Sequence, residues 1–145
     1  MSSRQLGARV ATVYEFQSAI LAPQLKTLGV AWSTFQLLTT IQASGDTTSQ
    51  AEIARRLGLA PATLSESVQL HVKKGLIEQV RHPHDARVRA LQLTDTGKAL
   101  MKKIQAIVNA NNRLLEEALT PEEASECARL LDKLIGAVEK AHSLA

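Results

Sequence analysis

The sequence predicts a mainly α-helical fold that carries one small β-hairpin near its middle. Three observations predict it. Aromatic residues make up only 3% of the chain while Ala and Leu dominate, which favours helix packing over a β-sandwich. Apolar residues recur at helical spacing on both sides of a central segment. Inside that segment, two strand-like runs surround a charged tip.

The length and composition indicate one folded domain over residues 1–145. A chain of 145 residues with 45% hydrophobic content can bury a core without metals or disulfides. The lone Cys127 cannot form an internal disulfide, which suggests a reducing compartment. There is no apolar run of ~20 residues and no apolar core of a secretory signal. We therefore expect a cytoplasmic protein.

Two helices are expected before the central segment. The first spans about residues 5–28, where Pro23 removes one backbone donor and predicts a kink or break. Its apolar face comprises Leu6, Val10, Val13, Ile20, Leu21, Leu25 and Leu28. The second spans about residues 33–43 and is stopped by Ser44-Gly45-Asp46.

The central segment begins with two short helices joined by a tight turn. Ser49 to Glu52 forms a capping box, and Gly58 can take the left-handed conformation that ends this helix. Pro61 suits the first position of the next helix, because a missing N–H costs nothing there. The core face of that second helix is expected to hold Leu64, Val68 and Val72.

The hairpin follows, with strands at about 77–81 and 88–93 and a tip at 82–87, where Pro83 and Asp85 suit a turn. A supporting helix, a helix sized for the major groove and an adjacent basic hairpin predict a winged helix-turn-helix. We expect this lobe to span about residues 32–96.

Two long helices are expected after the hairpin. Thr94 caps the first, to about Ala118, and the capping box Thr120 to Glu123 opens the last, to about His142. The terminal regions, about 5–31 and 97–142, hold more apolar surface than a small lobe covers. A second copy would cover it, so these regions are expected to form a homodimer; an intramolecular bundle is the alternative.

The positive charge is concentrated in the middle of the chain. Residues 47–98 hold eight Lys and Arg against five Asp and Glu, an excess equal to the net charge of +3 for the whole chain. Such a segment is typical of a protein with a polyanion partner, although an ordinary solvated surface can carry so small an excess.

Several of these motifs, in this order, resemble the MarR family of bacterial transcriptional regulators. They are the capping box, the Gly-ended turn, Lys73 to Ile77, Asp85-x-Arg87 and Leu93 to Gly97. The resemblance implies a homodimeric repressor on a pseudo-palindromic operator in double-stranded DNA. It also implies release by a small-molecule effector, often a phenolic or lipophilic acid.

The resemblance places candidate functional residues. Asp85 matches the residue that braces the wing, and Arg87 matches the wing arginine that enters the minor groove, where negative potential favours a guanidinium. Arg81 and Arg89 flank it and could hold phosphates. The candidate DNA-binding set is Thr63, Ser65, Glu66, Gln69, Arg81, Arg87 and Arg89.

Four positions depart from the family pattern, among them Ala60, which replaces the usual Ser or Thr cap. Glu66 and Ala86 stand where arginines are frequent, and His71 stands where a core leucine is usual. Glu66 would repel phosphates unless it accepts a hydrogen bond from a cytosine N4, and a solvated helix residue is equally consistent. These departures leave a second hypothesis open, a winged-helix protein-interaction module that has lost DNA binding.

The aromatic side chains Tyr14, Phe16, Trp32 and Phe35 all lie in the first quarter of the chain. In the resembling fold this region borders the effector crevice. Tyr14, Trp32 and Phe35 are therefore candidate effector-pocket residues, with simple core packing as the alternative.

Catalytic, cofactor and metal sites have little support. The sequence has no Gly-rich phosphate loop and no Ser/His/Asp arrangement, so no enzyme and no cofactor are expected. His82-x-His84-Asp85 offers a metal two ligands at most from one side, so we expect wing residues instead of a metal site. Cys127 has only Arg129 nearby as a basic activator and is expected to be a buried structural residue.

Overall fold

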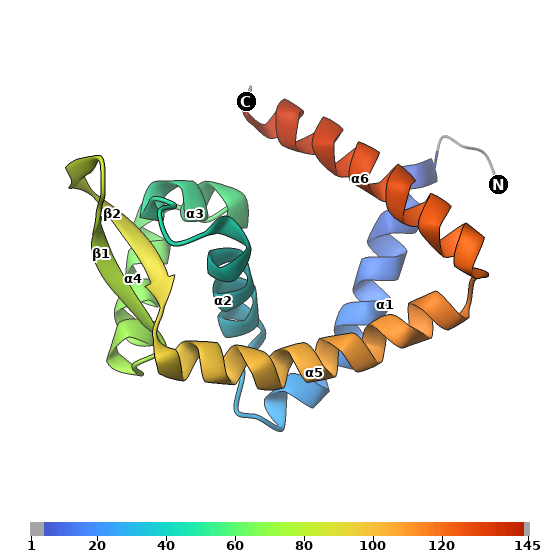
Figure 1. Cartoon of the computed structure of the whole chain (residues 1–145), viewed down its shortest axis with the longest axis horizontal. Coiled ribbons are helices and arrows are strands. Elements are labelled where there is room, and N and C mark those ends of the chain that lie inside the picture. The colour runs from blue at the N-terminus through green and yellow to red at the C-terminus, as the bar shows by residue number, and fades with distance from the viewer. Residues whose placement is uncertain (1–4, 144–145) are drawn as a thin grey trace. The chain divides into compact units, whose positions relative to one another are not determined.

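A computed structural model describes residues 5–143 of the chain, which contain helices and one two-stranded antiparallel sheet (Figure 1). The predicted fold class is confirmed. In chain order the elements are α1 (Leu6–Lys26), α2 (Trp32–Ser44), α3 (Gln50–Leu57), α4 (Pro61–Lys73), β1 (Ile77–His82), β2 (Asp85–Leu93), α5 (Asp95–Glu117) and α6 (Pro121–Ser143). The chain divides into two compact units, with the boundary inside α5 between Val108 and Asn109. No helix within the described range is long and apolar enough to cross a membrane.

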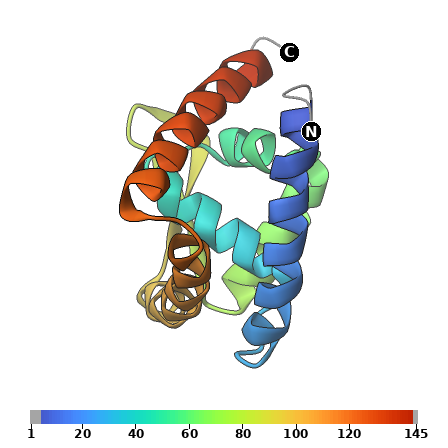
Figure 2. The same ribbon diagram turned by 90° about the vertical axis from the view of Figure 1, so that its right-hand side faces the viewer.

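The first helix, α1, runs unbroken through Pro23 to Lys26. The predicted break is therefore wrong. Pro23 removes only the bond that its own N–H would have donated, and α1 continues past it to Lys26. Leu21 and Leu25 near its C-terminal end are buried. In Figure 2 the blue α1 leads into the cyan α2 of the same unit.

Only half of the capping box predicted at α3 forms. Ser49 Oγ accepts a hydrogen bond from the Glu52 backbone N–H at 3.1 Å. The Glu52 carboxylate instead binds Arg55 and Arg56, with N–O distances of 2.6 and 3.0 Å. Hydrogen bonds from Arg55 and then Arg56 lower the pKa of Glu52 to about 2. Gly58 ends α3 in the left-handed conformation (φ 66°), as predicted.

One face of α4 packs into the core of the first unit. Leu64 and Val68 on this face are fully buried, as predicted, but the third buried position is His71, and Val72 is 41% exposed. His71 and not Val72 is buried because residues 64, 68 and 71, separated by four and then three positions, lie on one face of the helix.

The His71 imidazole, only 2% exposed, ties α4 to α2. Its Nδ1 lies 2.6 Å from the Ser67 carbonyl oxygen, which can only accept, so Nδ1 carries the proton. Nε2 is then the acceptor for the buried Thr34 hydroxyl at 2.8 Å. His71 is thus a core residue whose two ring nitrogens both have hydrogen-bond partners.

The hairpin is longer and its turn tighter than predicted. Partners run in register from Ile77 opposite Leu93 to Arg81 opposite Arg89, after which His82 pairs with Asp85. The turn proper is therefore Pro83-His84, and residues 86–88 bulge from the ladder instead of belonging to a broad tip.

Two backbone contacts attach the hairpin to its neighbours. Ser49 forms a bridge with Ala90, which joins β2 to the start of α3. At the other end of the hairpin, Leu76 O accepts from Thr94 N–H at 3.1 Å, and a Cβ placed on Gly97 would lie 2.1 Å from that oxygen. Only glycine allows α5 to begin this close to the hairpin.

The second unit contains the end of α5 and all of α6. Both hydrogen bonds of the capping box between Thr120 and Glu123 form, at 3.0 and 3.1 Å. No described residue of α6 is buried, and its exposed apolar stripe comprises Leu130, Leu131, Leu134, Ile135 and Val138. Cys127 is also exposed, so the expectation of a buried cysteine is wrong for this chain alone.

The Thr34–His71 pair provides a test of the core. Thr34→Val should lower the free energy of unfolding by about 1–3 kcal/mol, because the buried Nε2 acceptor loses its donor. The double replacement Thr34→Val with His71→Leu removes both polar partners and should recover most of the loss. Urea denaturation followed by circular dichroism measures both. A single-variant loss that the double variant does not reduce would contradict this pairing.

Candidate nucleic-acid interface

The burial of the inner face of α4 determines which residues point outward. Thr63, Glu66 and Gln69 are all exposed and lie three residues apart, so they share one outer face of the helix. Leu64 and Val68 occupy the opposite, buried face. The outer face thus offers a hydroxyl, a carboxylate and an amide, the groups that can hydrogen-bond with base edges.

Ser65 lies at the edge of this face and is half-buried. Its Oγ accepts a hydrogen bond from Gln50 Nε2 at 3.3 Å. Gln50 in turn bonds Gln79 on β1, and Gln79 bonds Arg89 on β2, so side chains connect α4 to the hairpin. Sequence reasoning missed Gln50 and Gln79, because only the tertiary placement of α3 beside the hairpin brings them together.

At the hairpin tip, Asp85 holds Arg87. Asp85 Oδ1 accepts from the Arg87 backbone N–H at 3.0 Å and from Arg87 Nε at 3.2 Å. The Arg87 side chain and then its backbone N–H hold the pKa of Asp85 below its usual value. The Arg87 side chain remains 91% exposed, so its guanidinium is accessible to a partner.

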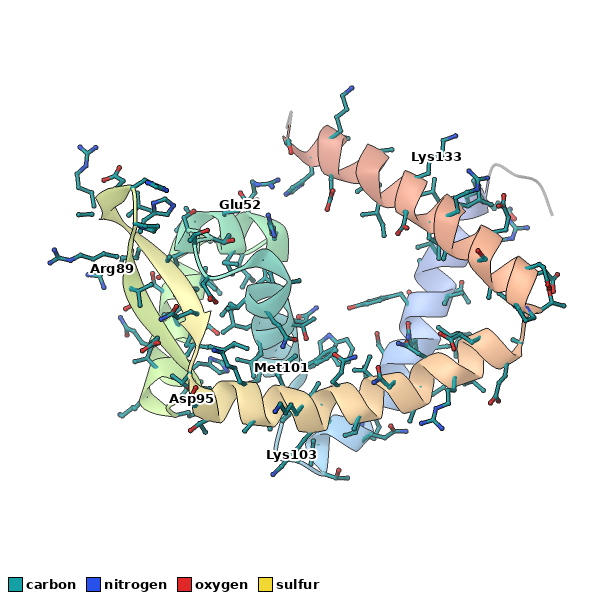
Figure 3. The ribbon with its side chains drawn as sticks, viewed as in Figure 1. Glu52, Arg89, Asp95, Met101, Lys103 and Lys133 are labelled. Atoms are coloured by element: carbon teal, nitrogen blue, oxygen red, sulfur yellow. The ribbon has the colours of Figure 1, made fainter. Side chains whose placement is uncertain are left out.

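The hairpin carries a hollow of about 370 Å³ without any carboxylate among its lining residues, which are Gln79, Val80, Arg81, Ala86, Arg87 and Arg89. Arg81 and Arg89 are directly opposite in the ladder. Like charges placed opposite one another destabilise a hairpin, and an anion between them would relieve the repulsion. In Figure 3, the labelled Arg89 points away from the ribbon, into the surroundings.

The histidines do not gather into one site. The rings of His82 and His84 are 5.8 Å apart, and His82 Nδ1 accepts from the His84 backbone N–H at 3.1 Å. His71 is buried elsewhere, against Thr34. Across residues 5–143, no three His, Cys, Asp or Glu side chains lie close enough together to hold a metal ion.

Three of the four aromatic residues form one cluster in the first unit. The ring centroids of Tyr14 and Trp32 are 6.5 Å apart in an edge-on arrangement, and those of Trp32 and Phe35 are 5.1 Å apart. Trp32 and Phe35 pack against the core, whereas Tyr14 is 52% exposed. Phe16 is 70% exposed and belongs to the apolar face of α1.

The sequence and the fold both match known proteins. Residues 28–88, from the loop before α2 into β2, match the MarR family. Over 96% of this chain and 99% of that one, the fold matches a MarR transcriptional regulator from Methanosarcina mazei Go1, with a TM-score of 0.78 and 17% identity.

Two similar structures contain DNA. A single-residue mutant of MarR from E. coli, in complex with operator DNA, has a TM-score of 0.70 and 24% identity; the match covers 89% of this chain and 92% of that one. The transcriptional repressor CouR, bound to a 23-mer duplex, has a TM-score of 0.74 and 22% identity, with coverage of 92% and 94%.

The Asp85–Arg87 contact predicts a measurable titration. Because the folded-state pKa of Asp85 is lowered, the contact stabilises the tip above the usual value of 3.8 and is lost as the pH falls through the folded value. Carboxyl ¹³C NMR should give an Asp85 midpoint below 3.8. Arg87→Ala should raise that midpoint, while Arg89→Ala on the same strand should leave it unchanged. Equal effects of the two replacements would contradict a specific contact.

Proposed function

We propose that this protein is a sequence-specific DNA-binding transcriptional regulator. Residues 28–88 match the MarR family, and the fold of 96% of the chain is similar to that of a MarR transcriptional regulator. The observation that carries the proposal is the combination of an exposed polar face on α4 with an arginine-lined hairpin beside it. An α-helix fits the major groove, and a projecting arginine suits the neighbouring minor groove.

The proposed contacts divide into two kinds. Thr63, Ser65, Glu66 and Gln69 of α4 would face base edges, where hydrogen bonds distinguish sequences. Arg81, Arg87 and Arg89 of the hairpin would contact phosphates and the minor groove, with Asp85 holding Arg87 in place. The E. coli mutant and CouR, which share this fold and are bound to DNA, support DNA as the partner.

The proposed active form is a homodimer that represses transcription. In this arrangement, residues 1–145 form one functional domain, with the lobe at about 32–96 and the pairing helices at about 5–31 and 97–142. The exposed apolar side chains of α1, the end of α5 and α6 support it, because a second copy would cover them. A dimer presents two α4 helices to the two halves of a pseudo-palindromic operator.

The proposed control is release of DNA by a small-molecule effector. The cluster of Tyr14, Trp32 and Phe35 supports a phenolic or lipophilic acid, since it offers aromatic faces together with a phenol hydroxyl and an indole N–H.

A second candidate is a winged-helix interaction module that does not bind DNA. Glu66 favours it, because a carboxylate lies exposed on the outer face of α4 where phosphates would approach. A gel-shift assay at stated salt, with the duplex upstream of its own coding sequence, separates the two candidates. A shifted complex supports the regulator, and its absence in dilute buffer supports the module.

The hairpin arginine gives a quantitative prediction. Arg87→Ala should weaken binding to that duplex and reduce the steepness of the salt dependence by about one in log–log slope, because one phosphate contact is lost. Fluorescence anisotropy over a salt series measures the slope. The control Arg113→Ala removes the same charge from α5 in the second unit and should leave the slope unchanged. Identical slopes for Arg87→Ala and the unaltered protein would contradict the proposed contact.

Self-association is tested on α6. The unaltered chain should sediment at twice 15.7 kDa. Leu134→Glu should raise the dimer dissociation constant at least about a hundredfold, because it buries an unpaired carboxylate twice in a symmetric interface. Lys133→Glu adds a negative charge one residue away, off the apolar stripe, and should leave the dimer intact. Sedimentation at the single-chain mass across micromolar concentrations would contradict a dimer.

A further inference from the structure

A chain of side-chain hydrogen bonds links the hairpin to α4 through two glutamines. Arg89 Nη1 donates to Gln79 Oε1 at 3.3 Å, and Gln79 Nε2 donates to Gln50 Oε1 at 2.8 Å. Gln50 Nε2 then donates to Ser65 Oγ at 3.3 Å. This series of hydrogen bonds crosses four elements, from β2 through β1 and α3 to α4.

The backbone explains why these four residues meet. Ser49 pairs with Ala90, which places Gln50, the first residue of α3, beside the hairpin. Gln79 is opposite Leu91 in the register, next to that bridge. The start of α3 therefore contacts both the hairpin and the N-terminal half of α4.

The arginine at one end determines which group donates and which accepts in each of these hydrogen bonds. A guanidinium is only a donor, so the oxygen of the Gln79 amide must face it and the nitrogen must face Gln50. The same reasoning orients the Gln50 amide, whose oxygen is occupied by Gln79 and whose nitrogen donates to Ser65. Ser65 Oγ thus accepts from inside the protein, and its own hydroxyl proton is left to donate outward.

We propose that Gln50 and Gln79 are positioning residues for DNA recognition, which fix Arg89 relative to α4 and make Ser65 a hydrogen-bond donor toward the duplex. This inference rests on the proposed DNA-binding function. The Ser65 hydroxyl would then donate to a purine N7, a guanine O6, a thymine O4 or a phosphate oxygen. An exocyclic amino group is excluded as its partner, because such a group also donates.

The hairpin supplies its own matched control. On the same two strands, Gln92 Nε2 donates to Glu78 Oε1 at 2.7 Å. This cross-strand hydrogen bond is as short as any of those that connect Arg89 to Ser65. Gln92 and Glu78 take no part in that connection. Replacing Gln92 removes an equivalent hydrogen bond from the hairpin without affecting the path to α4.

The test compares two duplexes at one salt concentration, one from upstream of its own coding sequence and one of random sequence and equal length. Gln79→Met and Gln50→Met keep the side-chain length but remove the amide, and each should lower affinity for the first duplex about three- to tenfold. Affinity for the random duplex should change less than about twofold. Gln92→Met should change neither affinity.

The double variant Gln50→Met with Gln79→Met should bind no more weakly than either single variant. Each single replacement already interrupts the hydrogen bonds between Arg89 and Ser65, so the second replacement has nothing more to remove. The positioning role would be overturned if the affinity losses of the two single variants added up in the double variant, or if the losses were equal on both duplexes. It would also be overturned if Gln79→Met still discriminated fully between the two duplexes. Failure of the unaltered protein to discriminate between the duplexes would instead contradict the proposed function itself.

The direction of the Ser65 bond has a separate test. Single substitutions can remove each candidate acceptor from the duplex. 7-deazapurine removes N7, 2-aminopurine removes guanine O6, 5-methyl-2-pyrimidinone removes thymine O4, and methylphosphonate removes a phosphate oxygen. The substitution that removes the acceptor of Ser65 should weaken binding of the unaltered protein. The same substitution should not weaken binding of Ser65→Ala any further. Persistence of every substitution's effect in Ser65→Ala would overturn the donor assignment.

Discussion

The burial of one face of α4 is the constraint on which the rest of the structure depends. Leu64 and Val68 are almost completely removed from solvent, and each such burial contributes about 1.5–3 kcal/mol. Rotating the helix by one residue would expose them and carry the charged Glu66 toward the core, which costs more than any surface contact could return. The outer face of α4 is therefore fixed by what its inner face must bury.

The hairpin completes this face by a different kind of interaction. Ile77 and Leu91, farther from the tip, belong to the hydrophobic core. Arg81, Arg87 and Arg89, nearer the tip, stay exposed around one hollow. The apolar end holds the hairpin in place, and the Ser49–Ala90 bridge aligns it with α3. Positive charge can then be placed beside the helix at little cost to the core.

Helices, caps and the inner face of α4 could be read largely from sequence, because local signals determine them. Gly58, Pro61 and the Thr120–Glu123 box all act within a few residues. Predictions failed where a tertiary partner decides the outcome. The Glu52 carboxylate binds two arginines instead of the Ser49 backbone N–H. His71 occupies a core position that Val72 was expected to fill. The glutamines between Arg89 and Ser65 gave no local signal at all.

In the proposed function, the outer face of α4 and the hairpin tip together form the surface that contacts DNA. Amide NMR spectra recorded while the duplex from upstream of its own coding sequence is added test it directly. The largest shifts should fall on Thr63, Ser65, Glu66, Gln69 and the hairpin from Arg81 to Arg89. Unchanged spectra, or shifts confined to α6, would contradict it.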